Sequence, residues 1–135
     1  MKVDGSCHCG RITFEAEVDP DKVLICHCTD CQIFSGGAFR TVVRTPAHAF
    51  KLLSGEPKVY VKQADSGNEF AQAFCGECGT PVYGAHPIDN PKFYGLRVGS
   101  LRQRHALPPR QQIWCRSAQP WLENLDALAK VEKHA

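Results

Sequence analysis

The chain has 135 residues, a formal net charge of +2 and eight cysteines. A chain of this length can bury a core of its own, and so small a charge without a basic run excludes nucleic-acid binding by electrostatic attraction. No apolar run reaches the roughly 20 residues of a membrane span, and the first residues lack the apolar segment of a secretory signal. We therefore expect a cytoplasmic protein with free thiols. It should form one domain over residues 1–135, with a core over about 3–122 and a tail over 123–135.

Short runs of alternating apolar and polar residues predict strands along most of the chain. The clearest run is 11–18, in which every second residue from Ile12 to Val18 is apolar. Further strands are expected over 23–25, 38–44, 58–62, 69–74, 80–84, 93–99 and 111–115, between turns rich in glycine and proline. Apolar residues at helical spacing after Pro120 predict one short C-terminal helix. The sequence therefore predicts an all-β protein with a single helix at its end.

Seven of the eight cysteines fall in three short clusters, at 7–9 (C-x-C), 26–31 (C-x-C-x-x-C) and 75–78 (C-x-x-C). Thiolates this close in sequence can converge on a metal at little loop-closure cost, whereas a disulfide within C-x-C would be strained. Thiolates are typical zinc ligands, so the clusters predict zinc sites. The eighth cysteine, Cys115, is expected to be a buried strand residue rather than a ligand.

The cysteine count suggests how two zinc ions would be shared. The first and last clusters together offer four thiolates, enough for a closed, structural site: Cys7, Cys9, Cys75 and Cys78. The middle cluster offers three: Cys26, Cys28 and Cys31. Three protein ligands leave a fourth position open, which is typical of catalytic zinc. The alternative is a second structural zinc, completed by Cys115, His27 or another histidine, and the spacing does not decide between the two.

Charge constrains the chemistry of an open three-thiolate site. Three thiolates on Zn²⁺ leave a net charge of −1, so the metal would be a weaker Lewis acid than one held by three histidines. Such a site suits the capture of a substrate thiol as its thiolate better than the activation of water.

Motifs in a fixed order resemble those of the glutathione-dependent formaldehyde-activating enzyme family, whose domain is shared with centromere protein V. These motifs are 5–10 (GSCHCG), 26–31 (CHCTDC), 74–80 (FCGECGT), 98–101 (VGSL), Ile113 and Trp121. The resemblance implies several small, curled antiparallel sheets around zinc, sometimes called a β-tent. It also implies that the first and last cysteine clusters share a structural zinc and that the middle cluster holds a second, labile, catalytic zinc.

The resemblance implies a zinc-dependent carbon–sulfur lyase. The family's named reaction condenses glutathione with formaldehyde to S-hydroxymethylglutathione, and this chain would act on an adduct of glutathione, or of another small thiol, with formaldehyde or a related aldehyde. Its catalytic residues would be the three zinc ligands of the middle cluster, Cys26, Cys28 and Cys31.

Other polar residues near the clusters have simpler interpretations. Arg40 and Arg44 are candidate anchors for the carboxylates of glutathione, although arginines on a solvated strand face would look the same. Asp30 is expected to cap a turn or to lie at the surface. His8 and His27, between the ligands, are expected to face solvent or to lie just behind the ligands.

Three other functions compete with the enzyme. These are a non-catalytic zinc-binding module for protein interaction, a zinc store or sensor, and a redox sensor whose freed thiolates oxidise. A structural module has no need of the three middle cysteines in addition to the other four, so their presence favours the enzyme.

Overall fold

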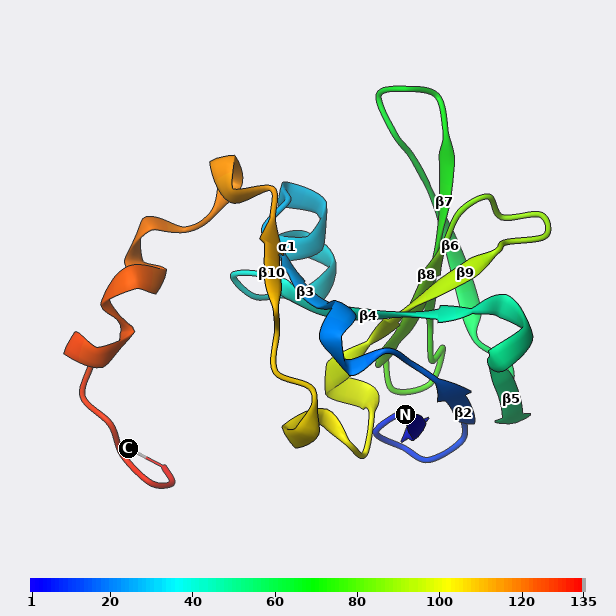
Figure 1. Cartoon of the computed structure of the whole chain (residues 1–135), viewed down its shortest axis with the longest axis horizontal. Coiled ribbons are helices and arrows are strands. Elements are labelled where there is room, and N and C mark those ends of the chain that lie inside the picture. The colour runs from blue at the N-terminus through cyan, green and yellow to red at the C-terminus, as the bar shows by residue number, and fades with distance from the viewer. Residues whose placement is uncertain (135) are drawn as a thin grey trace.

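The computed structural model describes residues 1–134, and the ten strands in that range form two sheets (Figure 1). The small sheet has the order β1–β2–β5, with the bounds Lys2–Ser6, Thr13–Glu17 and Lys51–Ser54. The large sheet has the order β10–β3–β4–β9–β8–β7–β6, with the bounds Gln111–Ile113, Val23–Cys26, Arg40–Pro46, Phe93–Arg97, Pro81–Ala85, Glu69–Phe74 and Lys58–Gln63. Neighbours pair antiparallel except β10 and β3, which are parallel. The predicted mostly-β fold is confirmed.

Helical structure is short and lies mainly in connections. The α-helix α1 (Thr29–Ser35) begins directly after Cys28, includes Cys31, lies where no helix was predicted, and ends at Gly36 with φ of 67°. The remaining helical turns are 3₁₀: η1 Pro20–Lys22, η2 Ala47–Ala49, η3 Val98–Ser100, η4 Arg104–Ala106, η5 Cys115–Ser117 and η6 Pro120–Ala127. Within residues 1–134, no helix combines the length and apolarity needed to cross a membrane.

The C-terminal part differs from expectation in two respects. The last strand ends at Ile113 because Trp114 adopts a left-handed conformation with φ of 57°. Cys115 therefore begins the turn η5 and is exposed, so the prediction of a buried strand cysteine is wrong. The predicted helix is the 3₁₀ segment η6, which is kinked at Asn124. In Figure 1 this segment (orange to red) runs away from the two sheets beyond β10.

The hydrophobic core lies between the two sheets. Phe14 on β2 is fully buried, and its ring lies 5.7 Å from that of Phe50, which also contacts Tyr83 and Tyr94 of the large sheet. Each large apolar side chain buried in this way stabilises the fold by about 1.5–3 kcal/mol. Gly5 on β1 permits the close packing, because a Cβ there would lie 2.3 Å from the Phe14 ring.

One face of the large sheet packs into the hydrophobic core, and the other carries Arg40 and the middle cysteine cluster. Successive strand residues point to opposite faces, and Val43 of β4 belongs to the core. Arg40, three residues earlier, therefore lies on the other face, directly opposite Cys26 of β3. Helix α1 covers this second face, since its Phe34 ring lies 5.5 Å from the Arg40 guanidinium. This arrangement places the middle cysteine cluster and Arg40 on the same side of the sheet.

Candidate metal centres

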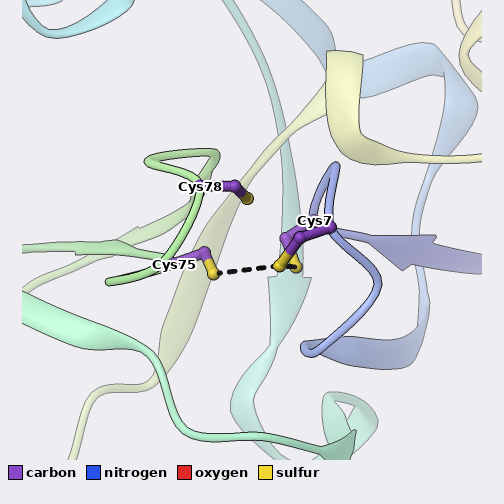
Figure 2. A group of neighbouring side chains, drawn as sticks. Cys7, Cys75 and Cys78 are labelled. Atoms are coloured by element: carbon purple, nitrogen blue, oxygen red, sulfur yellow. Dashed lines mark hydrogen bonds between the residues drawn. The ribbon is translucent and has the colours of Figure 1, made fainter.

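Four cysteines from distant parts of the chain meet at one end of the core. The Sγ atoms of Cys7, Cys9, Cys75 and Cys78 all lie within 4.8 Å of one another. Figure 2 shows the last two, on the turn between β7 and β8, facing Cys7 from the loop after β1. Cys7 and Cys75 are buried, and the other two lie nearer the surface. The group joins the small sheet to the large one.

Hydrogen bonds shape both turns around these sulfurs. The N–H of Ile12 donates to the Cys7 Sγ at 3.2 Å. On the other side, the Thr80 hydroxyl lies 3.2 Å from the Cys78 Sγ and accepts a hydrogen bond from the N–H of His8, which ties the two turns together. The Thr80 hydroxyl is the main reason why the pKa of Cys78 is lowered to about 5. This environment favours the thiolate form that a metal ligand requires.

The middle cluster is local in sequence and rests on the start of α1. Cys26 ends β3 and is buried, and Cys28 caps the helix by accepting a hydrogen bond from the N–H of Cys31 at 3.2 Å. The three Sγ atoms lie within 4.8 Å of one another, and no other cysteine, histidine or carboxylate of residues 1–134 joins the group. The pKa of Cys26 is lowered to about 5, chiefly by a hydrogen bond from Cys31, whose own pKa is raised.

Both groups fit a tetrahedral thiolate-bound metal. Bonds of about 2.3 Å from zinc to sulfur place two ligand sulfurs roughly 3.8 Å apart. The Cys7–Cys9 and Cys9–Cys75 sulfur pairs are separated by 3.6 and 3.8 Å. Soft ligands in this geometry are typical of zinc rather than of Ca²⁺ or Mg²⁺. The two clusters could each hold a metal ion, and zinc is compatible with both.

A cavity of about 530 Å³ lies between α1 and strands β6 and β7, and its walls include Asp30, the residue before Cys31, and Arg40, which pairs with Cys26 across the sheet. Its walls include Phe34 of α1 and Tyr60 of β6, whose rings lie 6.0 Å apart. Arg40 and Arg97 also line it, and both guanidinium groups donate to the Oε1 atom of Gln72, at 3.0 and 2.8 Å. Burial, and then the neighbouring Arg40, lower the pKa of Arg97 to about 9, so Arg97 remains cationic at neutral pH.

Comparison with known proteins identifies the family. The family model for glutathione-dependent formaldehyde-activating enzymes matches residues 2–117. This chain belongs to that family. A crystal structure of a Rhodobacter sphaeroides protein, solved by structural genomics, has a similar fold with a TM-score of 0.63. The two are 20% identical over 81% of this chain and 98% of the Rhodobacter chain, a level of identity that supports the shared fold alone.

In this member of the formaldehyde-activating enzyme family, some polar residues lie where the sequence suggested and others do not. Arg44 is exposed, as expected for a solvated strand arginine, but the same expectation is wrong for Arg40, which is only 5% exposed. Asp30 lies in the first turn of α1 and forms an ion pair with Lys62. His8 is exposed.

Of the two positions expected for His27, facing solvent or behind the ligands, the structure excludes the first. The His27 side chain is 2% exposed, its Nε2 atom lies 2.8 Å from the Gln112 Oε1 atom, and its Nδ1 atom is buried without a hydrogen-bond partner among residues 1–134. Because Gln112 is on β10, this contact links the cysteine segment to the last strand. The sequence pointed neither to this pair nor to Arg97 and Gln72, because each partner is remote in sequence.

Proposed function

We propose that this protein catalyses carbon–sulfur bond formation between a small thiol, with glutathione as the first candidate, and formaldehyde or a related aldehyde. It would act as a zinc-dependent lyase of its family, with the unit that carries the activity spanning about residues 3–122. Membership of the glutathione-dependent formaldehyde-activating enzyme family supports this type of function for the chain.

One observation carries the proposal: the two cysteine groups differ in the number of ligands. The first offers four sulfurs, which would close the coordination sphere of a structural zinc through Cys7, Cys9, Cys75 and Cys78. The second offers only Cys26, Cys28 and Cys31, and the neighbouring residues Asp30 and Arg40 line a cavity, which suits a site that must admit a substrate. Zinc bound there would supply Lewis acidity and would favour the thiolate form of a substrate thiol.

The residues around the cavity would assist the reaction in two ways. Phe34 and Tyr60 give one side of the cavity an aromatic wall, and a less polar wall strengthens electrostatic interactions beside it. Addition of a thiolate to an aldehyde creates an alkoxide, which needs a hydrogen-bond donor. Lys62 lines the cavity, and its pKa is raised, first by the hydrogen bond to Asp30. It therefore stays cationic and is the donor that we assign to this role.

The direct test follows formation of S-hydroxymethylglutathione from glutathione and ¹³C-formaldehyde by NMR exchange spectroscopy. The zinc-loaded protein should raise the exchange rate above that of the spontaneous reaction, and Cys28→Ser should abolish the increase. Cys115→Ser is the matched control, because Cys115 is exposed and lies outside both groups. Exchange no faster than the spontaneous rate, with glutathione and with other small thiols, would overturn the proposal.

A second candidate is a non-catalytic zinc-binding module for protein interaction. It draws support from the exposed apolar side chains of the C-terminal segment, where Trp114, Trp121, Leu125 and Leu128 are each about half exposed or more. This alternative predicts no increase of the exchange rate and intact zinc binding, so the same experiment separates the two functions.

A further inference from the structure

The cavity beside the middle cysteine cluster holds two arginines that share a single neutral partner. Arg40 from β4 and Arg97 from β9 both donate to the Oε1 atom of Gln72 on β7. No ion pair among residues 1–134 involves either arginine. Arg40 is buried and Arg97 is half-buried, and the anionic groups that act on both are the thiolates of the middle cluster. Incompletely compensated guanidinium groups are destabilising, so the pair indicates a site that can accept a further anion.

Most of the hydrogen-bonding capacity of these residues is unused. Each guanidinium has five N–H donors, and Gln72 takes one hydrogen bond from each. The other nitrogens of the two arginines have no partner among the described residues, and none of them is sealed from solvent. The arginines line both the cavity beside α1 and a second cavity of about 570 Å³, so their free donors open onto these spaces. The Gln72 side-chain amide adds an N–H₂ group to the same place.

Two glycines provide the floor on which the guanidinium groups lie. Gly84 of β8 pairs with Gly95 of β9, so neither strand has a side chain at this position, beside the Arg97 guanidinium. A Cβ on Gly84 would lie 2.6 Å from an Nη atom of Arg97. The arginines can therefore extend across the sheet, away from Cys26 on β3 and towards Gln72. Their placement suits a ligand in the cavity better than simple neutralisation of the cysteines.

The charges of the site also call for an anion. Three thiolates with Zn²⁺ would carry −1, and the two guanidinium groups carry +2, so the site would keep one positive charge. The Asp30–Lys62 ion pair at the cavity is neutral as a unit. Planar guanidinium groups bind carboxylates through paired hydrogen bonds, and the cavity volume lies within the usual range for small organic ligands.

We propose that Arg40, Arg97 and Gln72 form a carboxylate-binding subsite that makes the protein selective for acidic thiols. The substrate class is a small organic thiol that carries at least one carboxylate, held here while its sulfur reaches the middle cysteine cluster. This inference rests on the proposed function for the identity of the second group, but the subsite can be tested without any reaction.

The experiment titrates the zinc-loaded protein by calorimetry with S-methylglutathione, whose sulfur can no longer become a thiolate. Its diethyl ester is the comparison, because both carboxylates are replaced by neutral ester groups. Arg97→Met should weaken binding of the acid roughly tenfold to a hundredfold, the loss expected for hydrogen bonds to a charged group. Binding of the ester should be weak and unaffected by the substitution. Arg44→Met is the matched control, since Arg44 is exposed and lines neither cavity.

Any of three results would overturn the proposal of a carboxylate-binding subsite. These are equal affinities of the wild type and Arg97→Met for the acid, equal affinities of the wild type for acid and ester, or no binding of the acid by the wild type. Zinc content and a thermal melt establish that each variant is folded. If Arg97→Met does not fold, Gly84→Ala serves in its place, because its methyl group displaces the Arg97 guanidinium and keeps both charges.

The outcome is separable from that of the proposed function. Product formation that does not depend on Arg97, together with unchanged affinity for S-methylglutathione, would contradict the carboxylate subsite and support the enzymatic function. Arg97-dependent binding of the acid without any product would support the carboxylate subsite and contradict the proposed reaction with formaldehyde.

Discussion

Replacing Cys75 by serine should destabilise the protein far more than replacing Cys28. The four-sulfur group joins two turns that are distant in sequence, since 66 residues separate Cys9 from Cys75. A cross-link that closes a loop of this length lowers the entropy of the unfolded chain enough to stabilise the fold by about 4 kcal/mol. Because domains are typically stable by about 5–15 kcal/mol, loss of this metal-mediated link should remove a large part of the total.

The middle group closes a much shorter loop. Cys26 and Cys31 are five residues apart (31 − 26), so the same relation gives only about 2 kcal/mol. Serine at position 28 can also still cap α1, because its hydroxyl accepts the same N–H hydrogen bond as the Cys28 sulfur. We therefore expect Cys28→Ser to be the more stable variant by about 2 kcal/mol, and to bind one zinc fewer.

Urea unfolding, followed by circular dichroism, measures both free energies, and plasma mass spectrometry measures zinc per chain. Cys115→Ser provides the baseline and should change the free energy of unfolding by less than about 0.5 kcal/mol, because the side chain is exposed and outside both groups. Equal destabilisation by Cys75→Ser and Cys28→Ser would refute the division into one structural and one open site.

Three further predictions concern packing, protonation and metal release. Gly5→Ala should destabilise the protein by about 1–3 kcal/mol in urea unfolding, because its methyl group overlaps the buried Phe14 ring. Thr80→Val removes the hydroxyl that chiefly lowers the pKa of Cys78, so that pKa should rise. Protons would then compete with the metal at higher pH, and the midpoint of acid-induced zinc release, followed with a chromogenic chelator, should move upward. Mild chelation of the wild type should remove one zinc first and leave the far-ultraviolet spectrum unchanged, since a three-ligand site holds its metal less tightly than a four-ligand site.

The sequence predicted most of the strands because one face of each is apolar. The alternation at 11–18 anticipates β2 (Thr13–Glu17), which carries the fully buried Phe14. The sequence pattern did not predict α1, because a seven-residue helix is too short to show a helical period. Its ends are instead fixed by the caps at Cys28 and Gly36. The parallel pairing of β10 with β3 was equally hidden, since nothing local to either strand specifies a partner so distant in sequence.

The cysteine groups were foreseeable for a related reason, because thiols repeat in a recognisable spacing and have few other uses together. The spatial grouping of Cys7, Cys9, Cys75 and Cys78 is the one expected from that spacing. Arg40 was a candidate carboxylate anchor from the sequence, but its pairing with Arg97 was not foreseeable. An arginine in a strand is ordinarily solvated, and only the register that sets Gly84 and Gly95 beside Arg97 makes room for its guanidinium.

The order of the cysteines along the chain bears on how the two groups assemble during synthesis. Five of the seven clustered cysteines precede the last pair by at least 44 residues (75 − 31), which at 5–20 residues per second is roughly 2–9 s of translation. During that interval the early sulfurs outnumber the ligands that one zinc needs. Local hairpins can already form, and β1–β2 holds the first pair while β3–β4 holds the middle three. The nascent chain can thus gather the middle three thiols at one site before Cys75 and Cys78 emerge, whereas the four-sulfur group is completed only when that last pair arrives.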